Sequence, residues 1–331
     1  MGDYVLGIES TAHTFGVAVL DFSGRILSNE KESYVTESGG MIPMEVRAHH
    51  RRVAPKVYQK ALDASGISES EIGVVAFSNA PGLAPCLIEG MNFSRELAKR
   101  LGVEIVGVNH CIAHLEIGEV TGARDPVLLY ASGANTQVIA YEAGKYRVFG
   151  ETLDLGVGNF IDTFARHIGL GFPGGPKIEK LALECEDKKD LVELSYSVKG
   201  MDVSFSGIQT KLKNLFDRGF DVRKLCFSMQ EFVFAMLVEA SERALAHTGK
   251  NELLLGGGVA CNSRLQEMAR KMCEERGAKF YCPEKSLLVD NAAMIAYLGM
   301  KMKKAGLGTK DYEGFDIFPR QRTDDVEVVW K

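Results

Sequence analysis

The sequence lacks several features that would place it in a special class of protein. No apolar run reaches the ~18 residues needed to cross a bilayer, and the opening MGDYVLGIES has no basic segment of a signal peptide. We therefore expect a cytoplasmic protein without a membrane span. The net charge is −5, so the chain as a whole gives no sign of nucleic-acid binding. Any such contact must be local or be supplied by a partner.

Paired cysteines are also missing. The seven cysteines are odd in number, scattered and never spaced CxxC: Cys86, Cys111, Cys185, Cys226, Cys261, Cys273 and Cys282. This pattern favours reduced thiols in a cytosol and argues against a disulfide framework or a zinc ribbon. No low-complexity linker divides the 331 residues, so the two domains expected from this length should pack on each other.

What the sequence does contain is a repeated pattern of strands and polar turns. A strand over Tyr4–Glu9 runs into the polar turn Ser10–Thr14, and two more strands follow. Residues 126–152 have the same plan, with a hydroxyl-rich turn at Ser132–Thr136. Two such copies indicate an internal duplication with a cleft between the halves, and the alternative is a chance likeness of two hairpins.

Helical and strand patterns alternate between and after these copies, which predicts an α/β fold with a mostly parallel sheet. The helix expected over Met44–Ser65 contains Pro55, which should kink or divide it. On this helix His49–Arg52 form a basic cluster, which we expect to be a solvated helix face rather than a nucleic-acid patch. Further along, Asn262 is expected to cap a helix at its N-terminus.

Two histidines four residues apart, His110 and His114, are the first candidate ligands. On a helix this spacing places both imidazoles on one face, within reach of a single cation. A lone pair of this kind is more often structural, so its surroundings must decide. The apolar strand that ends at Tyr130 leads directly into Ser132, and such a turn leaves backbone N–H groups free to hold a phosphate.

A glycine-rich loop and a helix start complete the set. The loop Gly256–Gly258 follows a short apolar strand, and glycine lets the backbone approach a flat ligand. Asp290 with Asn291 is expected to cap the last helix. The order of two phosphate turns, a glycine loop and an aspartate resembles the actin, sugar-kinase and heat-shock ATPase superfamily. This resemblance implies an α/β fold of two duplicated lobes, expected over 1–125 and 126–331, with a nucleotide in the interlobe cleft.

Seven motifs narrow the resemblance to one family. GIESTAHTFGVAV, NHCIAHLE, YASGANTQ, FPGGPKIE, SFSGIQT, GGGVACN and DNAAMIAY are similar to those of the tRNA threonylcarbamoyltransferase family, the catalytic subunit of the archaeal and eukaryotic KEOPS complex. The likeness runs from about Val5 to Ala296. Ala134 stands where SGGNT is usual and Ala292 where DNGAM is usual. Each departure adds only a methyl group.

By this resemblance the metal ligands are His110, His114, Tyr130 and Asp290. Two imidazoles, a phenolate and a carboxylate suit one iron or zinc ion better than magnesium. On the residues alone, Tyr130 would be a core side chain and Asp290 only a helix cap. The family's nucleotide and substrate contacts fall on the second turn and later segments: Ser132, Gly133, Ala134, Asp162, Gly175, Glu179 and Asn262. Tyr130, Ala131 and Gly257 are expected to line the same site.

The resemblance implies transfer of a threonylcarbamoyl group from its adenylate to N6 of the adenosine next to the anticodon of tRNA. The adenine nucleotide is then part of the substrate, with ATP as a further candidate ligand, and His13 is a candidate general base. The implied partners are tRNA and the KEOPS subunits, which include a small atypical kinase and a dimerising subunit.

Three other functions compete: a zinc peptidase, an ATPase or kinase of the same fold, and a non-catalytic nucleic-acid-binding subunit. The peptidase needs a glutamate beside the first metal histidine, where this chain has Cys111.

Overall fold

The first half of the protein is built on a five-stranded mixed sheet. The computed structural model describes residues 2–36, 41–186 and 191–331. In sheet order the strands are β3 (Ile26–Ser33), β2 (Thr14–Asp21), β1 (Tyr4–Glu9), β4 (Ile72–Ala80) and β5 (Glu104–Asn109). β1 and β3 both pair with β2 in antiparallel fashion, whereas β4 pairs with β1 and β5 in parallel.

The second half repeats this sheet. Its strands are β8 (Lys145–Glu151), β7 (Thr136–Glu142), β6 (Val127–Ala131), β11 (Glu252–Gly256) and β12 (Lys279–Tyr281). The order and the pattern of parallel and antiparallel pairs are the same as in the first sheet. The predicted duplication is therefore confirmed. The prediction of a mostly parallel sheet is wrong, because the strands of each sheet that are joined by short turns can pair only in antiparallel fashion.

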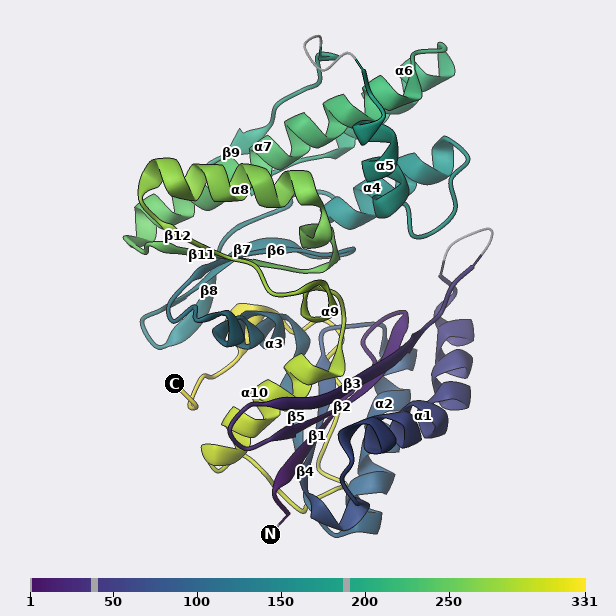
Figure 1. The fold of residues 1–331 in the computed structure, drawn as a ribbon, viewed down its shortest axis with the longest axis vertical. Helices are drawn as coiled ribbons and strands as arrows, with labels where there is room; N and C mark the ends of the chain where they lie inside the picture. The colour runs from purple at the N-terminus through teal and green to yellow at the C-terminus, as the bar shows by residue number, and fades with distance from the viewer. Residues whose placement is uncertain (1, 37–40, 187–190) are drawn as a thin grey trace.

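Helices separate and cover the two sheets (Figure 1). The outer face of the first sheet packs against α1 (Pro43–Ser65) and α2 (Ala84–Leu101). The outer face of the second sheet packs against α7 (Val222–Thr248). Around α7 lie α4 (Val157–His167), α5 (Gly175–Leu183), α6 (Ser206–Asp217) and α8 (Ser263–Arg276). Between the sheets lie α3 (His110–Glu116) and α10 (Ala292–Lys304), and the short α9 (Lys285–Leu288) precedes α10.

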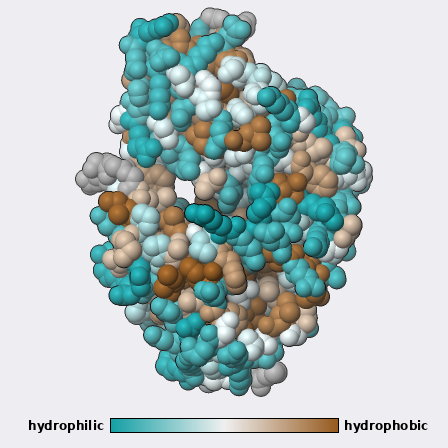
Figure 2. Space-filling model, turned by 180° about the vertical axis from the view of Figure 1, so that it is seen from behind, coloured by the Kyte–Doolittle hydropathy of each residue, from teal (hydrophilic) through white to brown (hydrophobic). Residues whose placement is uncertain are grey.

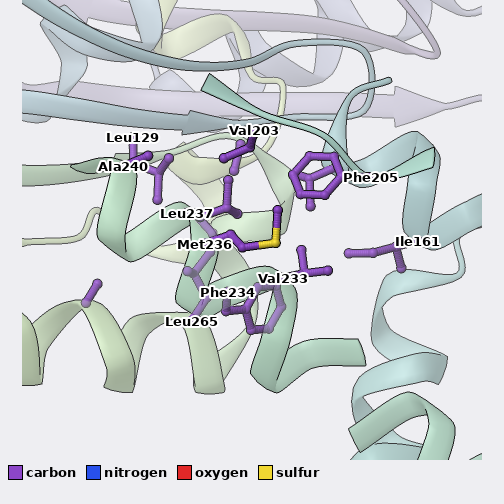
Figure 3. Close-up of a cluster of buried hydrophobic side chains, with 14 of the residues drawn as sticks. Leu129, Ile161, Val203, Phe205, Val233, Phe234, Met236, Leu237, Ala240 and Leu265 are labelled. Carbon is purple, nitrogen blue, oxygen red and sulfur yellow. The ribbon is translucent and has the colours of Figure 1, made fainter. Parts of the chain in front are cut away.

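Strand β6 illustrates how the sheet divides its side chains between two cores. Leu129 faces the cluster that α7 forms with the helices around it, and Figure 3 shows it beside Leu237 and Ala240 of α7. Leu128 and Tyr130 point to the opposite face and join the cluster between the sheets. Because side chains alternate along a strand, this register sends Tyr130 towards α3.

The last helix joins the two halves. α10 follows the second sheet in sequence, yet it packs on β1, β2 and β4 of the first sheet and against α3. The residue two positions before it, Asp290, is thereby brought to the start of α3. The division of the chain at residue 125 stays a prediction.

Helix α1 agrees with expectation in its shape and differs from it in the burial of its histidines. It runs through Pro55 without being divided, and Figure 1 shows its first turns at an angle to the rest. His49 and His50 are buried at 7% and 0% exposure, so the expected solvated face is wrong for them. Arg51 is exposed and pairs with Glu89 of α2 at 2.9 Å. The sequence does not reveal this burial, because the two histidines lie on the side of α1 that meets Phe15 and Tyr34. Among the described residues, no helix is both long and apolar enough to cross a membrane.

Candidate functional site

Three of the predicted ligands meet between the two sheets. His110 and His114 lie one turn apart on α3, and Asp290 lies just before α10. Oδ1 of Asp290 is 3.4 Å from Nε2 of His110 and 3.7 Å from Nε2 of His114. A ligand atom from each of the three residues lies within 4.8 Å of the others. Each residue can therefore offer one atom to a common cation.

The cap of α10 leaves Asp290 free. The side chain of Asn291 accepts the N–H of Met294 at 3.0 Å and caps the helix. The alternative in which Asp290 serves only as the cap is therefore wrong. Its carboxylate faces the two imidazoles instead.

A buried carboxylate orients His110. Glu9, at the end of β1, is fully buried, and its Oε2 lies 2.9 Å from Nδ1 of His110. Because a carboxylate only accepts, Nδ1 carries a hydrogen towards Glu9, and in the neutral ring the lone pair lies on Nε2. The other Glu9 oxygen accepts the N–H of Thr11 at 2.7 Å. This is the arrangement in which a second carboxylate holds a metal-binding histidine. Glu9 was not among the predicted site residues, although its place as an acidic residue at the end of an apolar strand was an available signal.

His114 supplies the test of whether a metal fits. It is 1% exposed, and neither of its ring nitrogens has a hydrogen-bond partner among the described residues. Buried polar atoms are rarely left without a partner, and each such atom costs about 1–3 kcal/mol. A cation bound by Nε2 would satisfy one of them. The three side chains therefore fit a metal ion.

The charges of the cluster are strongly coupled. Burial opposes ionisation of Asp290, but the two imidazoles outweigh it and hold the pKa of this carboxyl well below its usual range. Burial likewise opposes protonation of His110, but Glu9 and Asp290 raise its pKa well above the ordinary value. Burial lowers the pKa of His114, which therefore stays neutral and able to bind a metal.

Tyr130 lies beside this cluster. It is 1% exposed, and its ring centroid is 5.0 Å from that of His114. Burial raises the pKa of Tyr130 well above its usual value, so in the protein alone it is a neutral phenol. A nearby cation would favour the phenolate.

The turn after β6 presents free backbone donors. Within the described residues, the N–H groups of Gly133 and Ala134 donate to no protein acceptor. The turn is held from behind, because Ser132 accepts the N–H of Gly158 at 3.1 Å and Gly133 accepts that of Asn159 at 2.9 Å. Two free N–H groups on a rigid turn are suited to an anion.

Gly257 has a structural role that differs from the expected one. Its φ is +88°, and a Cβ there would lie 2.4 Å from the carbonyl oxygen of Ala131. The glycine is thus required by the close approach of the loop to the end of β6. The next residue, Gly258, is the open one, since a Cβ there would meet nothing nearer than 4.0 Å.

Four other predicted contacts gather where α4, α5 and α8 begin or meet. Asp162 accepts the N–H of Gly174 at 2.7 Å, and Glu179 accepts both the N–H and the hydroxyl of Ser263 through Oε1. Asn262 caps α8, as predicted from the sequence. At Gly175 a Cβ would meet nothing within 4 Å, so this helix start is open.

His13 lies on the first turn and reaches the second half of the molecule. Its ring packs edge-on against Phe172, with centroids 5.7 Å apart. Burial raises the pKa of Asp162, and the hydrogen bond from the N–H of Gly174 offsets part of this rise. The surface is hollowed between the two halves (Figure 2).

Comparison with known proteins gives consistent results. A family model described as tRNA N6-adenosine threonylcarbamoyltransferase matches residues 25–297. A protein of that name from Thermococcus kodakarensis is 51% identical over 326 residues, which cover 98% of this chain and 99% of that protein. A Methanosarcina mazei protein named probable bifunctional tRNA threonylcarbamoyladenosine biosynthesis protein is 50% identical over 99% of this chain, but the match covers 59% of that protein.

Solved structures of low identity share the fold. HypF from Thermococcus kodakarensis superposes with a TM-score of 0.62 at 14% identity, over 92% of this chain and 48% of that one. The activator of 2-hydroxyisocaproyl-CoA dehydratase from Clostridium difficile, with bound ADPNP, gives 0.56 at 13% identity, over 92% and 97%. The predicted α/β fold of two duplicated lobes is therefore confirmed.

Proposed function

The chain belongs to the tRNA N6-adenosine threonylcarbamoyltransferase family, and we propose that it makes N6-threonylcarbamoyladenosine in tRNA. In this reaction N6 of the adenosine next to the anticodon attacks the carbamoyl carbon of threonylcarbamoyl-adenylate. A new C–N bond forms, the bond to the phosphate oxygen breaks, AMP leaves and N6 loses a proton. The observation that carries the proposal is the buried cluster of His110, His114 and Asp290 beside a turn with free N–H groups.

We propose that His110, His114, Tyr130 and Asp290 hold one divalent metal ion. The mixed set of nitrogen and oxygen donors favours iron or zinc over magnesium. Such an ion, when bound, can act as a Lewis acid or a template for the substrate. Glu9 keeps the His110 ring in the tautomer that a metal requires.

The chain's own groups would do the positioning. The N–H groups of Gly133 and Ala134 are suited to hold the phosphate of the adenylate. Asp162 and Glu179 each keep one carboxylate oxygen that accepts no hydrogen bond from the described residues, and these oxygens can accept ribose hydroxyl hydrogens. Such positioning counts for much here, because the exocyclic amine is a weak nucleophile.

His13 is our candidate to accept the proton from N6. It lies at the junction of the two halves, and its imidazole is not one of the proposed ligands. A competing peptidase would need a glutamate beside His110, and Cys111 occupies that position.

We propose that other proteins complete the tRNA surface, including the small atypical kinase and the dimerising subunit implied by the KEOPS resemblance. The net charge is −5, and the His49–Arg52 cluster is partly buried with Arg51 neutralised by Glu89. Counterion release needs a concentrated basic surface. The isolated chain should bind tRNA more weakly, with a shallower salt dependence, than the assembled complex. Equal affinity and slope for both would contradict this. None of the cysteines in the described part of the chain forms a disulfide, which suits the cytoplasm.

The proposed activity is tested with tRNA, threonylcarbamoyl-adenylate and the partner subunits, followed by nucleoside analysis. The wild-type chain should form the modified nucleoside, and His114→Ala should lose nearly all of it. His167→Ala is the matched control, because this histidine is paired with Asp217 at the C-terminal end of α4 and is not one of the proposed ligands. Undiminished modification by His114→Ala, or none by the wild type, would refute the proposal.

A further inference from the structure

The helix that carries the two histidines depends on its neighbours for its stability and orientation. α3 has only seven residues, all of them buried. A helix this short is marginal by itself, because its few hydrogen bonds do not offset the cost of nucleation. The direction in which His110 and His114 point is therefore set by whatever contacts the rest of α3.

Residues 317–331, which we call the strap, connect the two halves beside α3. At its start Phe318 donates its N–H to Asn79 of β4 at 2.8 Å, and Pro319 accepts the N–H of Gly82 at 3.2 Å. Arg322 then pairs with Glu151 of β8, in the second sheet, at 3.3 Å. The strap is thus attached to both sheets.

The strap contacts α3 at both ends. At the N-terminus Asn109 caps the helix with Oδ1, and its amide donates to Oε1 of Gln321 at 3.0 Å. This bond orients the cap, because it places the amide nitrogen on the strap side and the oxygen on the helix side.

At the C-terminus of α3 the partner is Glu116, which is fully buried. Its Oε1 accepts the indole N–H of Trp330 at 3.0 Å. Lys301 and Tyr146 also hydrogen-bond this carboxylate, which therefore joins α3 to α10, β8 and the strap. Trp330 itself packs into the apolar cluster between the sheets.

We propose that Gln321 and Trp330 are positioning residues that aim His110 and His114 at the metal ion by fixing the two ends of α3. The inference rests on the proposed metal site for its consequence, but the contacts themselves belong to the protein alone. Loss of groups that hold a metal ligand typically weakens binding 10–100-fold, and these residues act one step further away. We therefore expect each change to weaken metal binding by roughly 3–10-fold.

The test compares Gln321→Met and Trp330→Phe with a control in the same C-terminal region. Tyr312→Phe is that control, because it removes a hydrogen bond to the carbonyl of Val103, which lies just before β5 and at the opposite end of that strand from α3. Zinc affinity is measured by chelator competition, and amide hydrogen exchange of α3 is measured in metal-free protein. Both strap variants should bind zinc more weakly and exchange faster in α3, while Tyr312→Phe changes neither. Gln321→Glu keeps an acceptor for the amide of Asn109, so this variant should retain the wild-type zinc affinity and the wild-type exchange of α3.

The two readouts separate this inference from the proposed function. If wild-type protein binds zinc and the strap variants match the control in both measurements, the strap does not position α3. If wild-type protein binds no zinc, the metal site is wrong, and unchanged exchange in α3 would then overturn the strap as well.

Discussion

Replacement of Glu9 by glutamine should disable His110 as a ligand while leaving the shape of the site intact. In the wild type the carboxylate accepts the hydrogen of Nδ1, which leaves Nε2 free to face Asp290. The other Glu9 oxygen is held by Thr11, so the glutamine oxygen is expected to keep that bond and turn its amide towards His110. The amide would donate to Nδ1 and shift the hydrogen to Nε2, the atom that the metal needs.

The expected cost follows from this change of tautomer. Loss of a carboxylate that holds a ligating histidine weakens metal binding by roughly 10–100-fold, or about 1.4–2.8 kcal/mol. A second effect acts in the opposite direction. The raised pKa of His110 means that a proton competes with the metal in the wild type, and removal of Glu9 lowers that pKa. The loss of affinity should therefore be largest at alkaline pH and shrink as the pH falls.

The assay is zinc affinity between pH 6 and 9, measured by chelator competition on metal-free protein. Glu252→Gln is the control, because Glu252 is also a buried carboxylate and accepts two backbone N–H groups, those of Arg124 and Asp125, at 2.8 and 3.0 Å. It should bind zinc like the wild type at every pH. Normal zinc binding by Glu9→Gln at pH 9, or an equal loss of affinity in Glu252→Gln, would refute this role of Glu9.

Three further predictions follow from the same region. Asp290→Ala should abolish metal binding and leave α10 intact, whereas Asn291→Ala should lower the free energy of unfolding by about 1 kcal/mol, because Asn291 is the cap. Zinc titration and urea unfolding of both variants measure these effects, and finding them exchanged would contradict the prediction. Gly257→Ala should destabilise the protein because of the positive φ and the nearby backbone at this position, whereas Gly258→Ala should fold normally. Equal melting temperatures of the two variants would contradict this difference. Gly258→Ala is therefore the cleaner probe of adenylate binding by calorimetry. In metal-free protein the raised pKa of His110 contributes its full stabilisation at pH values below 6.5, the ordinary pKa of histidine. The lowered pKa of Asp290 contributes its full stabilisation at pH values above 3.8, the ordinary pKa of aspartate. The free energy of unfolding should therefore fall as the pH rises from 6.5 through the folded pKa of His110, and the prediction fails if His110→Ala shows the same fall.

Much of the site was predictable because its signals are local. The spacing of His110 and His114 places them on one helix face wherever that helix lies. Strand alternation and a small-residue turn after Tyr130 predict free backbone donors. The Asn262 cap acts within three residues of its own position. Such features depend on neighbours in the chain, so the sequence determines them.

Contacts between distant segments needed the tertiary structure. Glu9 and His110 are 101 residues apart and meet because β1 and β5 lie in one sheet. Asp290 reaches α3 only because α10 returns to the first sheet, and Asn291 takes over the cap. The hydrophobic periodicity of a segment, two residues for a strand or 3.6 for a helix, does not indicate which sheet a helix will cover.

The same limit explains the expectations that were wrong. The basic run His49–Arg52 predicted a solvated helix face, but the two histidines of α1 are buried in the protein, whereas Arg51 is exposed and ion-paired. The alternation of helices and strands predicted a mostly parallel sheet, although the two meanders contribute antiparallel pairs. Local patterns determine which elements form and which face of each is apolar. The packing of two duplicated sheets around α3 and α10 decides which polar groups meet, because that choice depends on the shape of the whole interior.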